Sequence, residues 1–254
     1  MIESLVAVGL FVGMLVSIDI GYRIGERRKA EDLHNSIEVI GTVDAAVFGL
    51  LGLILAFTFS GASERLVIRR AQIVQEVNAI GTAYLRIGML DPSLQPEIKQ
   101  LFRQYLDKRI EVFDKFRDRK TSQAALQQSE TLQHEIWSRS MTACRNEAKT
   151  DACLLLLPAL NEMIDITTTR SVASQTHAPL IVLATLVGLA LAASTLSGYA
   201  MSAQHRRSVL HMTLFSLVVA GCIYVVLDLE YPRSGLINLR SADVALQQLR
   251  DTMR

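Results

Sequence analysis

Four long apolar runs alternate with polar segments along the chain of 254 residues. The runs extend over residues 4–21, 43–61, 179–200 and 209–227. Each run holds about the 18 or more mostly apolar residues that a bilayer core of roughly 30 Å requires. The pattern therefore predicts four transmembrane helices, which the lipid bilayer surrounds.

Residues 62–178, between the second and third runs, carry most of the charged side chains and show the spacing of amphipathic helices. Apolar side chains recur every three or four residues from 96 to 119, which marks one face of a helix. Further helical patterns cover residues 62–90, 123–148 and 151–170, and the segments "LDPSLQP", "RDRKTSQ" and "RNEAKTDA" separate the four. This part of the chain is predicted to be a water-soluble, antiparallel helical bundle.

The second apolar run passes into the charged segment without a proline or a cluster of turn residues, as "LLGLILAFTFSGASERLVIRRAQIVQEVNAIG" shows. We therefore expect one helix of about 45 residues, near 65 Å long, through Gly61. The predicted fold is all-α, with four transmembrane helices and an inserted helical bundle into which the second span continues. Its predicted domains are a transmembrane hairpin (1–61), the soluble bundle (62–178), a second hairpin (179–230) and a short amphipathic C-terminal tail (231–254).

Basic residues in the short loops predict the orientation. They lie after the first run and between the third and fourth runs, and none precedes the first run: Arg23, Arg27, Arg28, Lys29, Arg206 and Arg207. Loops rich in Lys and Arg stay in the cytoplasm, so both termini and residues 62–178 are predicted to face outward from a bacterial inner membrane. Arg65, Arg69 and Arg70 follow the second run, and they leave the opposite orientation open as an alternative. The first run has no basic residue before it, so we expect it to remain as an anchor.

Two of the three cysteines, Cys144 and Cys153, bracket the polar stretch "CRNEAKTDAC" between two helical patterns. Outside the cytoplasm such a pair can oxidise to a disulfide that closes a helical hairpin. The alternative is that both are small, partly buried residues. Cys222 falls in the fourth run, where packing is the expected role.

Small residues recur every three or four positions in three of the apolar runs. They are Gly9, Gly13, Ser17 and Gly21; Gly49, Gly52, Ala56 and Ser60; and Ala184, Gly188 and Ala192. Small side chains allow the backbones of membrane helices to approach closely. The pattern predicts helix packing, either within one chain or between subunits.

Four acidic residues lie at the ends of the apolar runs. Asp19 and Asp44 are near the predicted cytoplasmic side, where Arg23 or Arg27 could pair with them, and Asp228 and Glu230 are near the outer side. Acidic groups in such places need a partner or a function. Two interpretations stay open, a structural pairing and a proton or cation site.

Several classes of function are not supported. The net charge is +1 and no basic patch is present, so we expect no binding to nucleic acid. The histidines show no metal-ligand spacing, and neither a glycine-rich phosphate loop nor a nucleophile motif occurs. We therefore predict no catalytic residue, no metal site and no cofactor, and a protein that is not an enzyme.

Three segments carry a resemblance to a known family: "FGLLGLILAFTFSGASERLVIRRAQIVQEVNAIGTAYLR", "NEMIDITTTR" and "LDLEYPRSGLINL". Together they resemble the bestrophin-like family of bacterial membrane proteins. The resemblance implies kinship to bestrophins, which are pentameric ion channels whose second span lines the pore. Their pore is narrowed by apolar side chains one turn apart, and Leu51, Leu55 and Phe59 have that spacing here, so that dewetting could gate this neck. In bestrophins the domain between spans two and three is cytoplasmic, the side opposite to that predicted from the loop charges.

Two functions therefore remain at this point. The first is a homo-oligomeric channel or pore for an inorganic ion, with the second span at its centre. The alternative is a membrane-anchored sensor or scaffold whose helical domain binds a ligand or a partner. The first predicts ion conductance, and the second predicts none.

Overall fold

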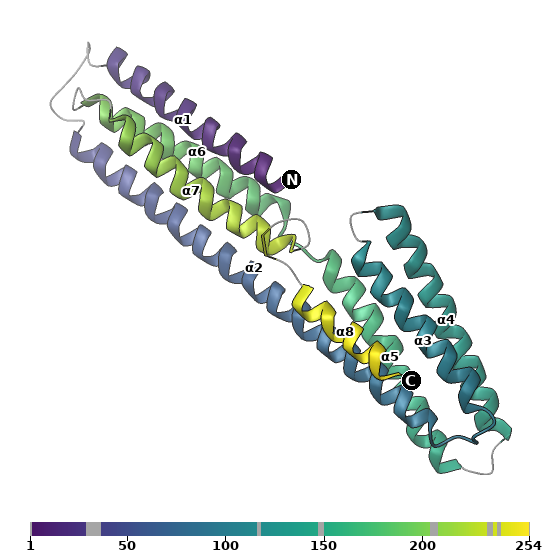
Figure 1. Cartoon of the computed structure of the whole chain (residues 1–254). Coiled ribbons are helices and arrows are strands. Elements are labelled where there is room, and N and C mark those ends of the chain that lie inside the picture. Colours follow the sequence, from purple (N-terminus) through teal and green to yellow (C-terminus); the bar gives the residue numbers. More distant parts are fainter. Residues whose placement is uncertain are drawn as a thin grey trace. The chain divides into compact units, whose positions relative to one another are not determined.

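The computed structural model describes residues 2–28, 37–115, 118–146, 150–203, 208–232, 236–237 and 240–253, and its regular secondary structure there is helical (Figure 1). The helices are α1 (Ile2–Arg28), α2 (Ile37–Ile87), α3 (Gln95–Asp114), α4 (Arg119–Asn146), α5 (Thr150–Gln175), α6 (Leu180–Ala203), α7 (Val209–Glu230) and α8 (Arg240–Thr252). The prediction of an all-α fold is confirmed.

Four helical stretches among the described residues are long and apolar enough to cross a membrane. They are Glu3–Arg27, Val43–Ile87, Asp151–Ser202 and Val209–Glu230. Each stretch contains one of the four apolar runs, so four candidate spans are present as predicted.

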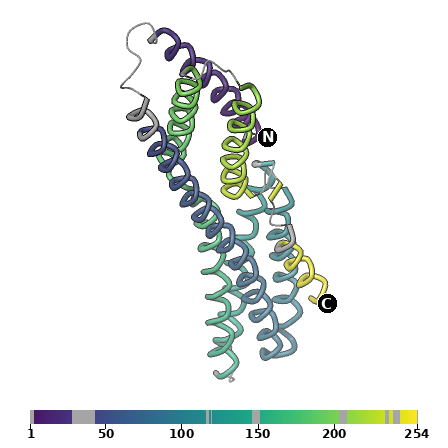
Figure 2. Tube along the Cα trace, turned by 90° about the vertical axis from the view of Figure 1, so that its left-hand side faces the viewer, coloured from purple at the N-terminus to yellow at the C-terminus, as the bar shows by residue number. Residues whose placement is uncertain are grey.

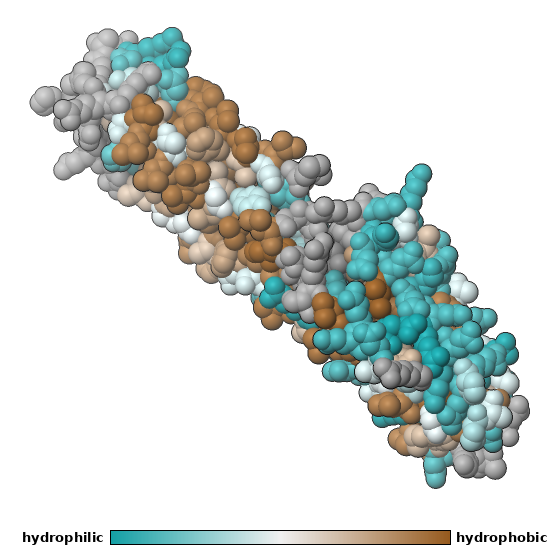
Figure 3. Space-filling view, in the orientation of Figure 1, coloured by the Kyte–Doolittle hydropathy of each residue, from teal (hydrophilic) through white to brown (hydrophobic). Residues whose placement is uncertain are grey.

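The chain divides into two compact units. Unit 1 comprises residues 1–66 and 177–237, and unit 2 comprises residues 67–176 and 238–254. Hydrophobic surface gathers over α1, α6 and α7 of unit 1, and hydrophilic surface gathers over α3 and α4 of unit 2 (Figure 3). The C-terminal helix α8 belongs to unit 2.

In unit 1, α1 lies against α6 and α7 (Figure 1). Two glycines permit the contact with α6, because a Cβ atom on Gly21 would lie 1.9 Å from the carbonyl oxygen of Thr195 and one on Gly198 would lie 2.0 Å from that of Ile18. The helix α2 joins this group through larger side chains: the Phe48 ring meets the Phe215 ring of α7 edge to face, with centroids 5.6 Å apart. Small residues thus bring α1 and α6 together at the backbone.

The helix α2 is continuous over 51 residues (Figures 1 and 2). Gly61 lies inside it, and the predicted continuation beyond the apolar run is therefore confirmed. The helix ends at Ile87, where the backbone N–H groups of Gly88, Met89 and Leu90 bond to carbonyls three residues earlier. Such bonds tighten the last turn of a helix.

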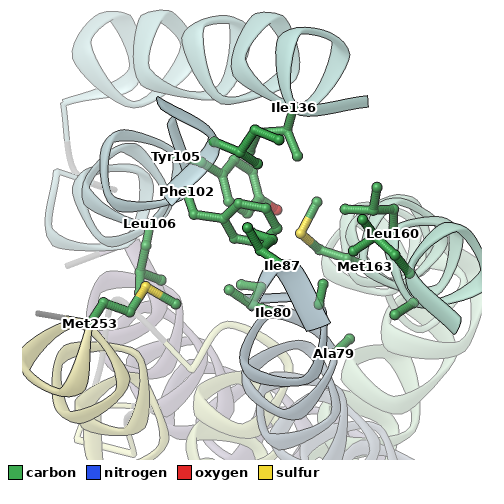
Figure 4. Packing of buried hydrophobic residues seen from close by; sticks show 14 of the residues in the cluster. Ala79, Ile80, Ile87, Phe102, Tyr105, Leu106, Ile136, Leu160, Met163 and Met253 are labelled. Atoms are coloured by element: carbon green, nitrogen blue, oxygen red, sulfur yellow. The ribbon is translucent and has the colours of Figure 1, made fainter. Parts of the chain in front are cut away.

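The core of unit 2 lies among α2, α3, α4, α5 and α8 (Figure 4). Its fully buried side chains include Ile80 and Ile87 of α2, Phe102 and Tyr105 of α3, and Met163 of α5. Leu246 of α8 and Met253, which directly follows α8, complete the same core. The sequence pattern predicts a short amphipathic tail over residues 231–254, and the structure forms α8 within this segment.

One predicted helix boundary is wrong. The pattern places the start of the fourth helix near Gln123, but α4 begins at Arg119. The carboxylate of Asp118 accepts hydrogen bonds from the backbone N–H and the hydroxyl of Thr121. This is the contact of an N-cap residue with the third residue of its helix, and it starts α4 about one turn earlier.

Candidate functional site

One face of α2 in unit 1 carries small residues that the chain itself does not cover. Gly49, Gly52, Ala56 and Ser60 are all exposed, and a Cβ atom added to Gly49 or Gly52 would have no described atom within 4 Å other than the adjacent backbone of its own helix. We call these four residues the α2 small face. The small residues predicted on the third span, Ala184, Gly188 and Ala192 of α6, are also exposed.

The small residues of α1 are used differently. Gly21 is buried against the backbone of α6, and a Cβ atom on Gly13 would touch Leu191 of α6 at 3.5 Å. On this helix the packing is within the chain, although Gly9 has no described neighbour within 4 Å. The α2 small face and the small residues of α6 are therefore both packing surfaces that are open in the single chain.

The three residues predicted as a pore neck do not share one environment. Leu51 is only 4 % exposed and lies in the core of unit 1, Leu55 is partly buried against that core, and Phe59 is 47 % exposed. A spacing of four residues advances by about 40° more than a full turn, so the side chains rotate from the core to the surface. Phe59 is the member of the set whose side chain faces outward.

Asp19 and Asp44 have different surroundings. The Asp19 carboxylate accepts a hydrogen bond from Arg23 Nε at 2.6 Å, one turn along α1. In contrast, Oδ1 of Asp44 is buried and has no hydrogen-bond partner among the described residues.

The basic residues Lys29, Arg206 and Arg207, which predict the orientation, lie outside the described residues.

Asp228 and Glu230, at the end of α7, are both almost fully buried and bind other parts of unit 1. Oδ2 of Asp228 accepts the backbone N–H groups of Leu236 and Ile237 at 3.1 and 2.9 Å. Glu230 pairs with Arg65 of α2 and accepts the N–H of Ala178 at 3.4 Å. These two carboxylates connect α7 to the segment that follows it, to α2 and to the start of α6.

His177 completes the contacts of Glu230. Its Nδ1 lies 3.7 Å from Oε2 of Glu230, and its ring stacks on Tyr231 with centroids 4.6 Å apart. Neither Arg65 nor His177 is predicted from the sequence as a partner of Glu230. Residues 165 and 53 positions apart share no local pattern that could reveal these pairs.

A buried charge cluster holds unit 2 together. Glu76 of α2 accepts a hydrogen bond from Arg109 Nε of α3 at 2.6 Å and also pairs with Arg170 of α5. The Arg170 guanidinium lies over the Phe113 ring, 3.7 Å from its centroid, and its Nη2 is 3.2 Å from Asp243 of α8. The cluster joins four helices of unit 2 through ion pairs.

The ionisation of Glu76 follows from its neighbours. Glu76 lies in unit 2, beyond the apolar run of residues 43–61. Burial by itself would raise the pKa of this carboxyl, but the positive charges of Arg109 and Arg170 outweigh burial and hold the pKa below its usual value. Glu76 is therefore a carboxylate that neutralises two buried cations.

The sequence contains a signal for this cluster that apolar periodicity alone misses. Glu76 occupies the buried face of α2 between Ile73 and Ile80, and Arg109 occupies the buried face of α3 between Tyr105 and Val112. A charged residue at an apolar position of a helical pattern needs a buried partner. The pattern can thus identify the charges, but it cannot tell which of them pair.

Cys144 and Cys153 form a disulfide in unit 2, between the end of α4 and the start of α5. Their Cα atoms are 5.7 Å apart, within the range that the bond requires. The third cysteine, Cys222, is free and exposed on α7. The disulfide closes the hairpin between α4 and α5.

Comparison with known proteins adds to this geometry. A family model described as the Bestrophin-like domain matches residues 8–244. The fold is similar to a bacterial bestrophin homologue from Klebsiella pneumoniae, in crystal structures of two mutant forms. These have TM-scores of 0.66 and 0.63, and they are 12 % and 13 % identical to this chain. Each alignment covers 97 % of this chain, and the two alignments cover 98 % and 97 % of the respective homologue chains. The search of curated proteins found no match.

Proposed function

The chain belongs to the bestrophin-like family, and we propose that it assembles into a homo-oligomeric ion channel whose pore is lined by α2. Family membership and the four apolar helices identify it as a multi-pass membrane protein. The homo-oligomer, the ion and the role of α2 are our proposal.

The observation that carries this proposal is the open α2 small face. Membrane helices associate through small residues because their backbones can then approach closely. Gly13 and Gly21 of α1 are used within the chain, whereas the α2 small face is left exposed, as are the small residues of α6. A neighbouring copy can cover this face, which would bring the α2 helices of several copies to the centre of an assembly.

We propose that the narrow part of the pore is formed by those of the three predicted neck residues whose side chains face outward. Phe59 is exposed and Leu55 is partly so, while Leu51 packs in the core of unit 1. We therefore assign the constriction to Phe59 first. A ring of apolar side chains can close a pore to ions by dewetting.

We further propose that unit 2 lies outside the cytoplasm. The loop charges favour this side, and a disulfide between Cys144 and Cys153 persists in an oxidising compartment. A reporter that is active only in the cytoplasm, fused at residue 130, should be silent. An active reporter would reverse the orientation without affecting the channel proposal.

The experiment for the channel proposal is a mass measurement of the detergent-solubilised protein, paired with an ion flux assay in liposomes. The proposal predicts an oligomer that conducts. An oligomer or a monomer without flux would contradict it and would favour the sensor or scaffold.

A further inference from the structure

Two helices of unit 2 flank a long groove. Arg69 of α2 donates to the carbonyl of Thr176 at 2.7 Å, and Arg86 of α2 donates to that of Leu155 at 2.6 Å, so α2 and α5 lie side by side. Between them two hollows of about 400 and 640 Å³ adjoin, and both are lined by Asp165 and Thr169. We call this the α2–α5 groove.

The groove combines unpaired acidic groups with an apolar wall. Glu162 and Asp165 are exposed on one face of α5, three residues apart, and neither carboxylate pairs with a cation among the residues that the structure describes. Like charges at this spacing destabilise a helix slightly. Val172, which lines the same groove, is 61 % exposed. The groove thus suits a cation on an apolar stem.

A matching surface lies on another side of α2. Arg70 is exposed, and no described residue forms an ion pair with it. Val67, three residues before Arg70, is 60 % exposed, and Val74, four residues after Arg70, is 50 % exposed. On one helical face, therefore, a guanidinium stands between two exposed valines. We call these three residues the Arg70 ridge.

The Arg70 ridge cannot fill the groove of its own chain. Gln72 and Gln75 of α2 line the groove. At 100° per residue, Arg70 lies about 200° from Gln72 and about 140° from Gln75 around the helix axis. Its side chain therefore leaves α2 on the side away from Asp165 of the same copy, and only another copy can bring an Arg70 into this groove.

From this complementarity we infer that the Arg70 ridge of one copy docks in the α2–α5 groove of the next, with Arg70 paired to Asp165. The inference rests on the homo-oligomer of the proposed function and names its contact in unit 2. The two surfaces differ, so the contact is heterologous, and repeated contacts of this kind close into a ring when the rotation allows. Arginine is enriched in protein interfaces, which fits this contact.

Charge reversal in the full-length, detergent-solubilised protein tests the contact. Arg70→Glu and Asp165→Arg should each weaken assembly. The protein concentration at which half of the oligomer has dissociated should rise by about tenfold or more in each variant. The combined variant should restore assembly toward the wild-type concentration, since it recreates the pair with the charges exchanged. Arg145→Glu and Glu135→Arg, which reverse exposed charges on α4, should leave assembly unchanged.

The outcomes separate this inference from the proposed function. A wild-type oligomer that conducts, with single variants that assemble normally, would overturn the docking contact and leave the channel intact. Single variants that dissociate without rescue in the combined variant, at an unchanged thermal midpoint, would overturn the Arg70 to Asp165 pairing. A wild-type protein that is monomeric and silent would overturn both.

Discussion

Glu76 accepts a hydrogen bond from Arg109 at 2.6 Å and pairs with Arg170 at the same time, so one carboxylate of α2 neutralises guanidinium groups of α3 and α5. The three side chains are at most 7 % exposed. Removing one partner from a buried ion pair costs more than the pair itself contributes, because a charge is left without compensation. Unit 2 should therefore depend strongly on this single residue.

Glu76→Gln should lower the free energy of unfolding by about 3–5 kcal/mol, since it leaves two buried arginines facing a neutral amide. Denaturation of the full chain in detergent measures this change. The matched control is Glu97→Gln, because Glu97 pairs with Arg139 on the surface with more than half of each side chain exposed. Its effect should stay below about 1 kcal/mol. Equal losses in both variants would contradict the role of the cluster.

The ionisation of Glu76 should also make the stability of the folded protein depend on pH. The pKa of Glu76 is lower in the folded protein than in the unfolded chain, where it is about 4.3. Its contribution is therefore complete above about pH 4.3 and is lost as the pH falls through the folded pKa. Thermal midpoints recorded from pH 7 to pH 3 should fall at the acid end, and less so for Glu76→Gln. Identical acid profiles for the two proteins would contradict this assignment.

Two glycines of α1 should respond in opposite ways to the same substitution. Gly21→Ala places a Cβ atom 1.9 Å from a backbone oxygen of α6, which cannot move aside easily, and should cost about 1–3 kcal/mol or more. Gly9→Ala meets no described atom within 4 Å and should be neutral or stabilising. Thermal midpoints in detergent compare the two. A fall of the same size in both would show that the close contact with α6 is not the cause.

The disulfide should contribute to stability only under oxidising conditions. Cys144→Ser should lower the free energy of unfolding by about 2–3 kcal/mol, as expected for so short a loop, and the difference from the wild type should vanish in reductant. Cys222→Ser, at the free and exposed cysteine, serves as the control and should change little. Thiol labelling of the wild type that is the same with and without reductant would show that Cys144 and Cys153 are not bonded.

Local sequence patterns were sufficient to predict the helices, but they were insufficient to predict which side chains the helices bring into contact. The apolar runs predicted the helical stretches that could cross a membrane, and the lack of turn residues around Gly61 predicted the continuity of α2, because both depend on neighbouring residues. The boundary at Asp118 was missed because a side-chain cap, rather than periodicity, starts α4.

Side-chain partners are harder to predict because they depend on how helices turn toward one another. The resemblance to bestrophins pointed to Leu51, Leu55 and Phe59 as one apolar neck, whereas Leu51 is buried in the core of unit 1. The same limit applies to Glu76 and Arg170, which lie 94 residues apart. A charged residue on an apolar face predicts burial of that charge, whereas its partner requires the tertiary structure.

The central claim, an ion pore lined by α2, is tested most directly by cysteine modification in liposomes. In a Cys222→Ser background, Phe59→Cys should conduct, and a charged methanethiosulfonate reagent should then change its ion flux strongly, because the modified side chain lies in the ion path. Leu217→Cys on α7, 58 % exposed on another helix, should show no change in flux with the same reagent. Absence of flux from the assembled protein, or equal sensitivity of the two variants, would contradict a pore lined by α2 at Phe59.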